Sequence, residues 1–455
     1  MAVHDEKTVA QYLAELVSRI SITSFSEKER SIVRKHMLDA VGAAFIGSRL
    51  EMFQDFIKLC PRTKEGCPWP GSGSERLTPI DAGMVWAYAI HSSVFEDGSR
   101  EGACHPAAAV MPAIIALSEG KDWQLIDKSA IAAYDVMVRL ARSGNPRFTV
   151  KGFHPTSITA PFGAAAAASV LLGYNVSQTE SALCLAALGS AGLMCAFKAG
   201  QTQPLQVAWA VRSGIFSAIM AGKGFSGYSR IIEEGFYPAF LGAEPDPTVD
   251  YPLECEYAIQ GCYLKPYPGC RHLHPSIDAF GKIMDETKIN STEIEGIDVR
   301  TYKVAVETEI EKIDKRGDAY FNIAYALAAR AVLGKNDWDT FDEKHFTNEH
   351  LIKLMKKVKV YVDPEIDSIY PNKRGSIVEV HTVDGNNFYS KVLQSLGEPE
   401  NPLSHSIIRD KFRYAAGPFL SKKSIERMEN LLHVLEPGGS AGSLFQVVCE
   451  NAHAI

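Results

Sequence analysis

The spacing of apolar residues changes twice along the chain, and this change constrains the fold more than any other feature. Up to about residue 257, apolar side chains recur at helical spacing, as in Leu13, Leu16 and Ile20. From about 258 to 400 they alternate as in β-strands around two intervening helices, and the remaining residues are helical again. A chain of 455 residues is too long for a single hydrophobic core, so we expect two domains. The spacing of apolar residues predicts a mainly α protein. An all-helical domain of residues 1–257 and 401–455 would hold an inserted, smaller α+β domain of residues 258–400.

Local signals refine this plan. Ser26 followed by Glu29 has the pattern of a capping box at the start of a helix. Alternating β-type residues predict strands over 297–306, 358–362 and 377–383, and Asp384-Gly385 predicts a hairpin turn with 388–392 as the returning strand. Asn401-Pro402 predicts the start of a helix. Five consecutive alanines at 164–168 predict a helix that packs closely in the interior.

Composition excludes several classes of function. The net charge is −7 and there is no long basic run, so nucleic acid is not the expected partner. The nine cysteines are scattered without a CxxC pair, which favours reduced thiols over a disulfide framework or a zinc ribbon. Asp5 and Glu6 are untypical of a signal or transit peptide, and the apolar run 164–172 is too short to span a bilayer. We therefore expect a cytoplasmic protein without a membrane role.

One loop gathers positive charge. Lys265, Arg271, His272 and His274 lie within ten residues, stiffened by prolines, just before an apolar helical run. The N-terminus of a helix carries partial positive charge and free N–H groups, which suits a bound carboxylate. A rigid surface loop with solvated charges is the alternative interpretation, and the loop alone leaves both open.

Histidines lie beside or near proline in three loops that precede helices, at His105, His154 and His272/His274. Histidine is the side chain best suited to proton transfer near neutral pH. A histidine in a loop is, however, more often structural than catalytic. The spacing of His272 and His274 points two ligands apart, and no Cys or carboxylate partner has ligand-like spacing, so we do not expect a metal.

At these loops the chain resembles the MmgE/PrpD family, which includes 2-methylcitrate dehydratase, cis-aconitate decarboxylase and iminodisuccinate epimerase. The resemblance covers nearly the whole chain in order. The segments that carry it are His91–Asp97 with His105-Pro106 and Pro112, Gly152–Thr156 before Gly163, Gln201–Leu205, Gly222–Gly227, Lys265–Cys270 with His274, and Asp318-Ala319 with Tyr325.

The resemblance implies a helical domain plus an α+β lid domain, usually as a homodimer, with a site between the domains that needs no metal or cofactor. It also implies proton transfer next to, or vinylogous to, a carboxylate of a small carboxylic acid. The residues that it places in catalysis are His105, His154, His274 and Tyr325. It also places Lys265 in the site. From the residues and the resemblance together, we expect substrate binding by Asp97, Lys198, Gln203, Lys265, Arg271 and His272.

This sequence departs from the family pattern at the site. In the family's His-x-x-Asp-Phe-Asp-Asp-Thr, the first Asp is Val94 here and the Thr is Gly98. The lysine of the family's Thr-Lys-Pro-Leu-His is Gln203, and Lys198, five residues earlier, would return the charge. The loss of one Asp and one Lys favours a substrate with fewer carboxylates than a citrate-like triacid.

Three functions fit these observations. The first is a lyase that removes water or CO2 from a small organic acid. The second is an isomerase, epimerase or cyclase that acts on a less charged metabolite. The third is a relative that binds a small molecule without turning it over.

Overall fold

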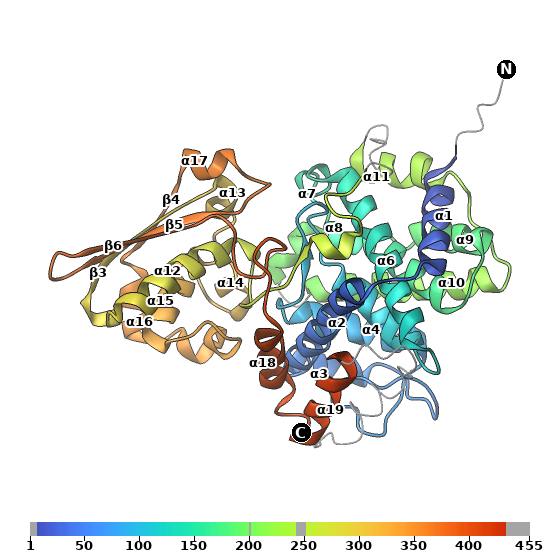
Figure 1. The fold of residues 1–455 in the computed structure, drawn as a ribbon, viewed down its shortest axis with the longest axis horizontal. Helices are drawn as coiled ribbons and strands as arrows, with labels where there is room; N and C mark the ends of the chain where they lie inside the picture. Colours follow the sequence, from blue (N-terminus) through green and yellow to red (C-terminus); the bar gives the residue numbers. More distant parts are fainter. Residues whose placement is uncertain (1–6, 200–201, 243–251, 434–455) are drawn as a thin grey trace. The chain divides into compact units, whose positions relative to one another are not determined.

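The computed structural model describes residues 7–199, 202–242 and 252–433 (Figure 1). The chain divides into two compact units, which we call the helical unit and the α+β unit. The α+β unit runs from Leu264 to Leu403, and the helical unit is formed by the chain before and after it. The sequence placed the inserted domain at 258–400. The protein is mainly α-helical, with a smaller α+β part, as the spacing of apolar residues predicted.

The helical unit contains thirteen α-helices among the described residues. They are α1 (Val9–Ile22), α2 (Glu27–Gly47), α3 (Glu51–Lys58), α4 (Pro79–Ser92), α5 (Ala107–Leu117), α6 (Trp123–Gly144), α7 (Arg147–Val150), α8 (Pro155–Leu171), α9 (Val176–Ala187), α10 (Thr202–Gly222), α11 (Tyr237–Leu241), α18 (His405–Ala416) and α19 (Lys422–His433). The predicted capping box begins α2, where the Ser26 N–H donates to the Glu29 carboxylate at 2.7 Å. A two-stranded antiparallel pair, β1 (Gly98–Ser99) with β2 (Cys262–Tyr263), joins two distant segments of this unit.

Helix α8 is the centre of the helical unit. Every one of its residues is buried, including the alanines 164–168, and it packs against α5, α6, α9 and α10. Small residues allow this close approach: a Cβ added to Gly214 of α10 would lie 2.3 Å from the carbonyl oxygen of Pro161 in α8. The predicted interior helix is therefore confirmed.

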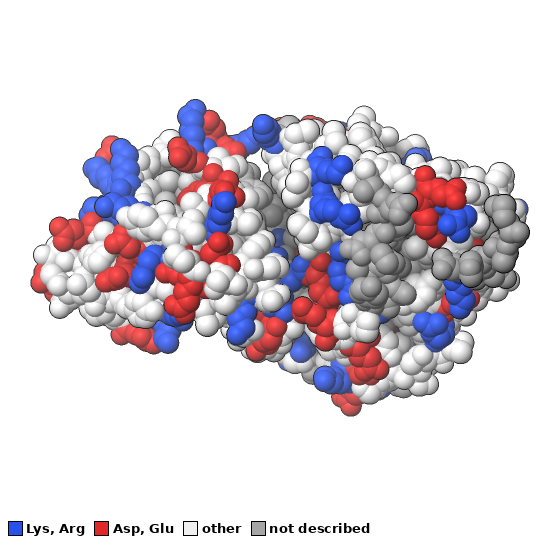
Figure 2. Space-filling view, turned by 90° about the horizontal axis from the view of Figure 1, so that it is seen from above, with Lys and Arg blue, Asp and Glu red and all other residues white. Residues whose placement is uncertain are grey.

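Helix α10 is the one described helix long and apolar enough to cross a membrane. Half of that apolar window is buried, and the helix packs against α4, α8 and α9. These contacts are those of a core helix. On the face shown in Figure 2, positive and negative side chains of the described residues are interspersed, without an extended patch of one sign.

The α+β unit is built on a four-stranded sheet of order β4-β3-β5-β6. The strands are β3 (Ile294–Thr301), β4 (Val358–Val362), β5 (Ser376–Thr382) and β6 (Asn387–Val392). Strand β3 is parallel to β4 and antiparallel to β5, and β5 pairs antiparallel with β6 across the turn at Gly385. The helices are α12 (His274–Thr287), α13 (Lys303–Glu307), α14 (Arg316–Ala319), α15 (Ile323–Leu333), α16 (Glu349–Met355) and α17 (Pro364–Ser368). Helix α12 packs on β5 and β6, and α15 packs on α12 and α16.

Two predictions of local structure were wrong. Strand β3 ends at Thr301, and residues 303–307 form helix α13 rather than a continued strand. The cause is tertiary, because the Asp367 carboxylate accepts the Lys303 N–H at 2.8 Å and so caps a new helix. The helix expected from Asn401-Pro402 begins instead at His405, where the Ser404 hydroxyl caps α18.

Candidate active site

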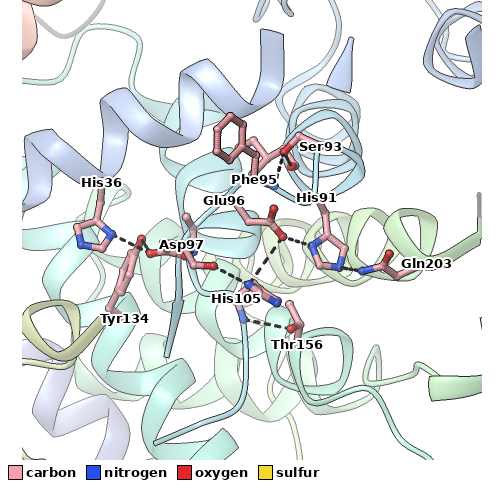
Figure 3. Close-up of polar contacts among 12 residues, drawn as sticks. His36, His91, Ser93, Phe95, Glu96, Asp97, His105, Tyr134, Thr156 and Gln203 are labelled. Atoms are coloured by element: carbon pink, nitrogen blue, oxygen red, sulfur yellow. Dashed lines mark hydrogen bonds and ion pairs between the residues drawn. The ribbon is translucent and has the colours of Figure 1, made fainter. Parts of the chain in front are cut away.

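Three histidines from separate segments of the helical unit meet in one place. Figure 3 shows two of them, His91 and His105, with Glu96 and Gln203. His91 lies at the end of α4, His105 just before α5, and His154 at the N-terminus of α8. The ring centroid of His91 lies 5.6 Å from that of His105 and 5.5 Å from that of His154. We call these residues, with Glu96 and Gln203, the histidine cluster.

His91 is held at both ring nitrogens. Its Nδ1 lies 2.7 Å from Oε1 of Glu96, and both side chains are only 1% exposed. The side-chain amide of Gln203 donates to its Nε2 at 2.9 Å. The Glu96 carboxylate and the Gln203 amide, one at each ring nitrogen, fix the orientation of the His91 ring.

His105 is the most accessible ring of the histidine cluster, with 24% of its side chain exposed. Its Nδ1 lies 2.5 Å from the carbonyl oxygen of Asp97 and must therefore carry a proton. Its backbone N–H donates to the Thr156 hydroxyl at 3.1 Å, and Oε1 of Glu96 lies 3.8 Å from Nδ1. With Nδ1 committed as a donor, proton exchange at this ring takes place at Nε2.

His154 is buried at the N-cap position of α8, with Nδ1 2.7 Å from the Ser157 hydroxyl. Its ring stacks on His91 at an interplanar angle of 23° and meets Phe197 edge-on at 5.1 Å. Burial holds the pKa of His154 well below its usual value, and the charges of His91 and His105 lower it further. A helix N-terminus also disfavours a cation. His154 is therefore neutral near pH 7 and able to accept a proton.

Asp97 is adjacent to the histidine cluster and contacts His105 through its main-chain carbonyl. Its carboxylate is fully buried and accepts hydrogen bonds from His36 Nδ1 (2.8 Å), the Tyr134 hydroxyl (2.8 Å) and the Ala107 backbone N–H (2.9 Å). Its main-chain carbonyl orients His105. Asp97 was expected to bind substrate; in this structure both of its carboxylate oxygens accept hydrogen bonds from within the protein.

The loop that carries Glu96 and Asp97 is strained and braced. Val94 has φ of 51°, in the left-handed region that a β-branched residue rarely adopts. From α18, the Lys411 ammonium donates to the carbonyl oxygen of Phe95 at 2.7 Å and to the Asp39 carboxylate at 2.6 Å. Through Lys411, helix α18 thus contacts both this loop and α2.

In the α+β unit, the predicted cationic loop is ordered and buried. Lys265 is 1% exposed and Arg271 is 3% exposed. Arg271 donates to Glu398 at 2.9 Å, to Nδ1 of His274 at 2.8 Å, and to the carbonyl oxygen of Leu396 at 3.1 Å. Its guanidinium therefore orients His274, which begins α12, and is engaged within the unit rather than presented to an anion.

The two remaining residues of this unit are also engaged. His272 Nδ1 lies 2.5 Å from the Tyr302 hydroxyl, and burial, helped by the nearby Arg374, lowers its pKa to about 3. The Tyr325 hydroxyl donates to the carbonyl oxygen of Thr340 at 2.7 Å, and its ring packs on Phe341. The resemblance placed Tyr325 in catalysis; in this structure its hydroxyl proton is donated to the backbone.

Of the residues in the histidine cluster, the sequence analysis singled out His105, His154 and Gln203 as candidates and did not single out His91 and Glu96. The signal was present, because His91 and Glu96 stand in the segment that carries the family resemblance. Lys198 lies exposed on the 3-10 helix Met194–Ala199, next to the Phe197 that packs on His154. Within the described ranges, no group of three or more His, Cys, Asp or Glu side chains is arranged to hold a metal ion.

Comparison with protein families gives the same result along the chain. The MmgE/PrpD N-terminal domain matches residues 11–248, and the MmgE/PrpD C-terminal domain matches residues 267–436. The chain belongs to the MmgE/PrpD family. The first match ends within the helical unit, and the second spans nearly all of the α+β unit and continues into α18 and α19.

Curated relatives match this chain over most of its length and of their own. Cis-aconitate decarboxylase of Homo sapiens is 26% identical over 94% of this chain and 92% of its own length. The protein of that name from Mus musculus is 25% identical over 94% of this chain and 91% of its own length. Cis-aconitate decarboxylase of Aspergillus terreus is 23% identical over 87% of this chain and 86% of its own length.

Proposed function

We propose that the protein is a lyase that acts on a small carboxylic acid, by decarboxylation or dehydration, without a metal or cofactor. The observation that carries this proposal is the histidine cluster, where a neutral, buried His154 stands beside the more accessible His105. Membership of the MmgE/PrpD family and the names of the curated relatives support the same class of reaction.

The chemistry needs one base, one acid and a place for negative charge. In decarboxylation the C–C bond to the leaving carboxylate breaks, CO2 departs, and the electron pair stays on carbon, delocalised into a conjugated carboxylate, until a proton arrives. In dehydration a base removes a proton from carbon and an acid protonates the leaving hydroxyl, so that water is lost. His154 suits the base, and His105, exchanging protons at Nε2, suits the acid.

In the α+β unit we propose His274 as a further acid–base residue and Lys265 as a cation for the substrate carboxylate. Arg271 orients His274 through its 2.8 Å contact with Nδ1. His272 and Tyr325, whose partners are Tyr302 and the backbone of Thr340, are proposed to shape the unit. Lys198 remains a proposed binding residue because it is exposed.

An isomerase is the second candidate, and one observation favours it. Gln203 occupies the position where the family pattern has lysine. Its side chain is uncharged and forms a hydrogen bond with His91. Fewer cations in the histidine cluster suit a substrate with fewer carboxylates. In an isomerase the proton removed from carbon would return to the same intermediate, with no loss of water or CO2.

Proton NMR in D2O separates these candidates. The purified protein would be incubated with cis-aconitate, citrate, 2-methylcitrate and smaller unsaturated or amino diacids. Loss of CO2 or water from one of these acids is the expected result. Deuterium exchange without net loss would mean an isomerase. A thermal shift without any reaction would mean a binding protein, because ligand binding raises the melting temperature whether or not chemistry follows.

We also propose a cytoplasmic homodimer. Helix α10 presents Trp209 and Phe216 on one exposed face, at 58% and 50% exposure, and such a face is typical of an interface between copies of a chain. Light scattering coupled to gel filtration should give twice the chain mass of 49.8 kDa. Trp209→Glu with Phe216→Glu should give a monomer, and a wild-type monomer would refute the proposal.

A further inference from the structure

The ring of Tyr263 occupies the space that a side chain at position 98 would fill. Strand β1 pairs antiparallel with β2, and in this pair Gly98 lies directly opposite Tyr263. A Cβ atom added to Gly98 would lie 2.3 Å from the Tyr263 hydroxyl oxygen and 2.4 Å from its Cζ. Gly98 is in a strand and its φ is not positive, so the backbone conformation does not require glycine. Glycine is needed at this position for space.

The Tyr263 ring lies on the face of the loop that bears the histidine cluster. Neighbouring side chains of an extended segment point to opposite faces, and directly opposed residues of an antiparallel pair share a face. The Asp97 carboxylate lies on one face, against α2 and α6, and the Glu96 carboxylate lies on the other, against His91. A side chain at Gly98 would follow Glu96, and the Tyr263 ring takes its place.

The Tyr263 hydroxyl is close to the most accessible histidine of the cluster. The carbonyl oxygen of Asp97, which precedes Gly98 in the chain, lies 2.5 Å from Nδ1 of His105. Given the covalent geometry of the peptide, the Tyr263 hydroxyl oxygen lies at most about 9 Å from that ring nitrogen. Tyr263 is 4% exposed, so packing fixes the position of its ring.

An aromatic ring at this place changes which groups the site can accept. The family pattern has threonine at position 98, and a threonine hydroxyl can both donate and accept hydrogen bonds. The face of an aromatic ring carries negative potential, and a carboxylate buried without a cation or a hydrogen-bond donor is costly. Gln203 adds no positive charge where the pattern has lysine. A further carboxylate beside this ring would therefore be poorly compensated.

We propose that Tyr263, with Gly98 leaving room for it, is a specificity-determining residue of the proposed active site. Its ring occupies the space that a third carboxylate would need, and it restricts the substrate to small dicarboxylic acids. The inference rests on the proposed lyase function and names the class of substrate for that same site. Tyr263 bounds the substrate and takes no part in proton transfer.

Two acids that differ by one carboxylate test this proposal. Citraconate is cis-aconitate without the carboxylate on its saturated carbon. Isothermal titration calorimetry gives the dissociation constant of each acid, and the ratio of kcat/KM values replaces it where the acids are turned over. The wild type should prefer citraconate. In Tyr263→Ala combined with Gly98→Thr, which restores the family residue at position 98, the ratio should move toward cis-aconitate by about 10- to 100-fold.

Tyr174 provides the matched control, because it packs on a glycine in the same way. A Cβ atom added to Gly222 would lie 2.0 Å from the Tyr174 hydroxyl oxygen, which donates to the carbonyl oxygen of Ala218. Tyr174→Ala should leave the ratio unchanged. Tyr263→Leu serves if the double variant does not fold. An unchanged ratio in a folded Tyr263 variant, or a wild type that prefers cis-aconitate, would overturn the proposal.

A failure of the proposed function is distinguishable from a failure of this inference. A shift in the ratio of dissociation constants without turnover of any acid would leave Tyr263 as a specificity residue and remove the lyase. Turnover of cis-aconitate by the wild type, with a kcat/KM at least equal to that for citraconate, would support the lyase and refute the role of Tyr263. Binding of neither acid would also refute that role, and the other acids of the NMR panel would then test the lyase alone.

Discussion

Replacing Lys411 by methionine should destabilise the helical unit and release the loop that carries Glu96 and Asp97. The Lys411 ammonium donates to the Asp39 carboxylate at 2.6 Å and to the carbonyl oxygen of Phe95 at 2.7 Å. The side chains of Lys411 and Asp39 are 5% and 0% exposed. Methionine keeps much of the volume of lysine, so the change removes charge and hydrogen bonds rather than packing.

The size of the effect follows from burial. Removing one partner of a buried ion pair costs about 3–5 kcal/mol, because the other charge is left without compensation. Protonation of Asp39 would remove its charge and so reduce this loss of stability. Burial already raises the pKa of Asp39 and Lys411 opposes that rise, so the pKa must rise further once Lys411 is gone.

Protonation of Asp39 determines how the stability deficit of Lys411→Met changes with pH. A carboxyl whose pKa is raised in the folded state contributes stability at low pH, and that contribution is lost as pH rises through the folded-state pKa. The deficit of Lys411→Met should therefore be larger at pH 8 than at pH 6, by up to about 1.4 kcal/mol per pH unit. Urea unfolding followed by circular dichroism at both pH values measures it.

Two variants make the comparison sharp. Lys411→Met combined with Asp39→Asn should recover most of the lost stability, because no uncompensated charge remains. Lys58→Met, which removes the exposed ion pair of Lys58 with Asp55, should change stability by about 1 kcal/mol or less. Equal stability of Lys411→Met and Lys58→Met, or a deficit that does not depend on pH, would refute the reasoning.

Four further variants test single features. Val94→Asn should raise the free energy of unfolding by about 1 kcal/mol, because asparagine tolerates the observed φ of 51°; thermal melting beside Val94→Ala checks it, and equal melting temperatures would contradict it. Gly214→Ala should lower stability by about 1–3 kcal/mol, because its Cβ would lie 2.3 Å from a carbonyl oxygen of α8; Gly317→Ala, with nothing within 4 Å, is the control. His154→Gln should reduce turnover by about 10²- to 10⁴-fold in the NMR assay while the fold persists, and full activity would remove His154 from the mechanism. Tyr325→Phe should lower stability by about 0.5–1.5 kcal/mol and leave turnover unchanged, so a large loss of turnover would restore Tyr325 as a proton donor.

Much of the fold could be predicted from the sequence because the spacing of apolar residues depends only on nearby positions. The helical spacing of Leu13, Leu16 and Ile20 and the alternation of β5 each depend on neighbours a few residues away. Local signals fail where a residue distant in the sequence determines the secondary structure. The alternating pattern predicted a strand through residue 303, but Asp367 caps a helix there. Ser404, rather than the Asn-Pro signal before it, begins α18.

For the candidate site, the sequence alone determined the residue types and their order: histidines in loops before helices, an acidic loop after α4, and lysine and arginine before α12. Only the tertiary structure decided which atoms these side chains contact, because the contacts join residues far apart in the sequence. Asp97 and Arg271 have hydrogen-bond partners inside the protein. Glu96 faces His91, and His91 lies on His154, through contacts between α4 and the start of α8 that no spacing along the chain encodes.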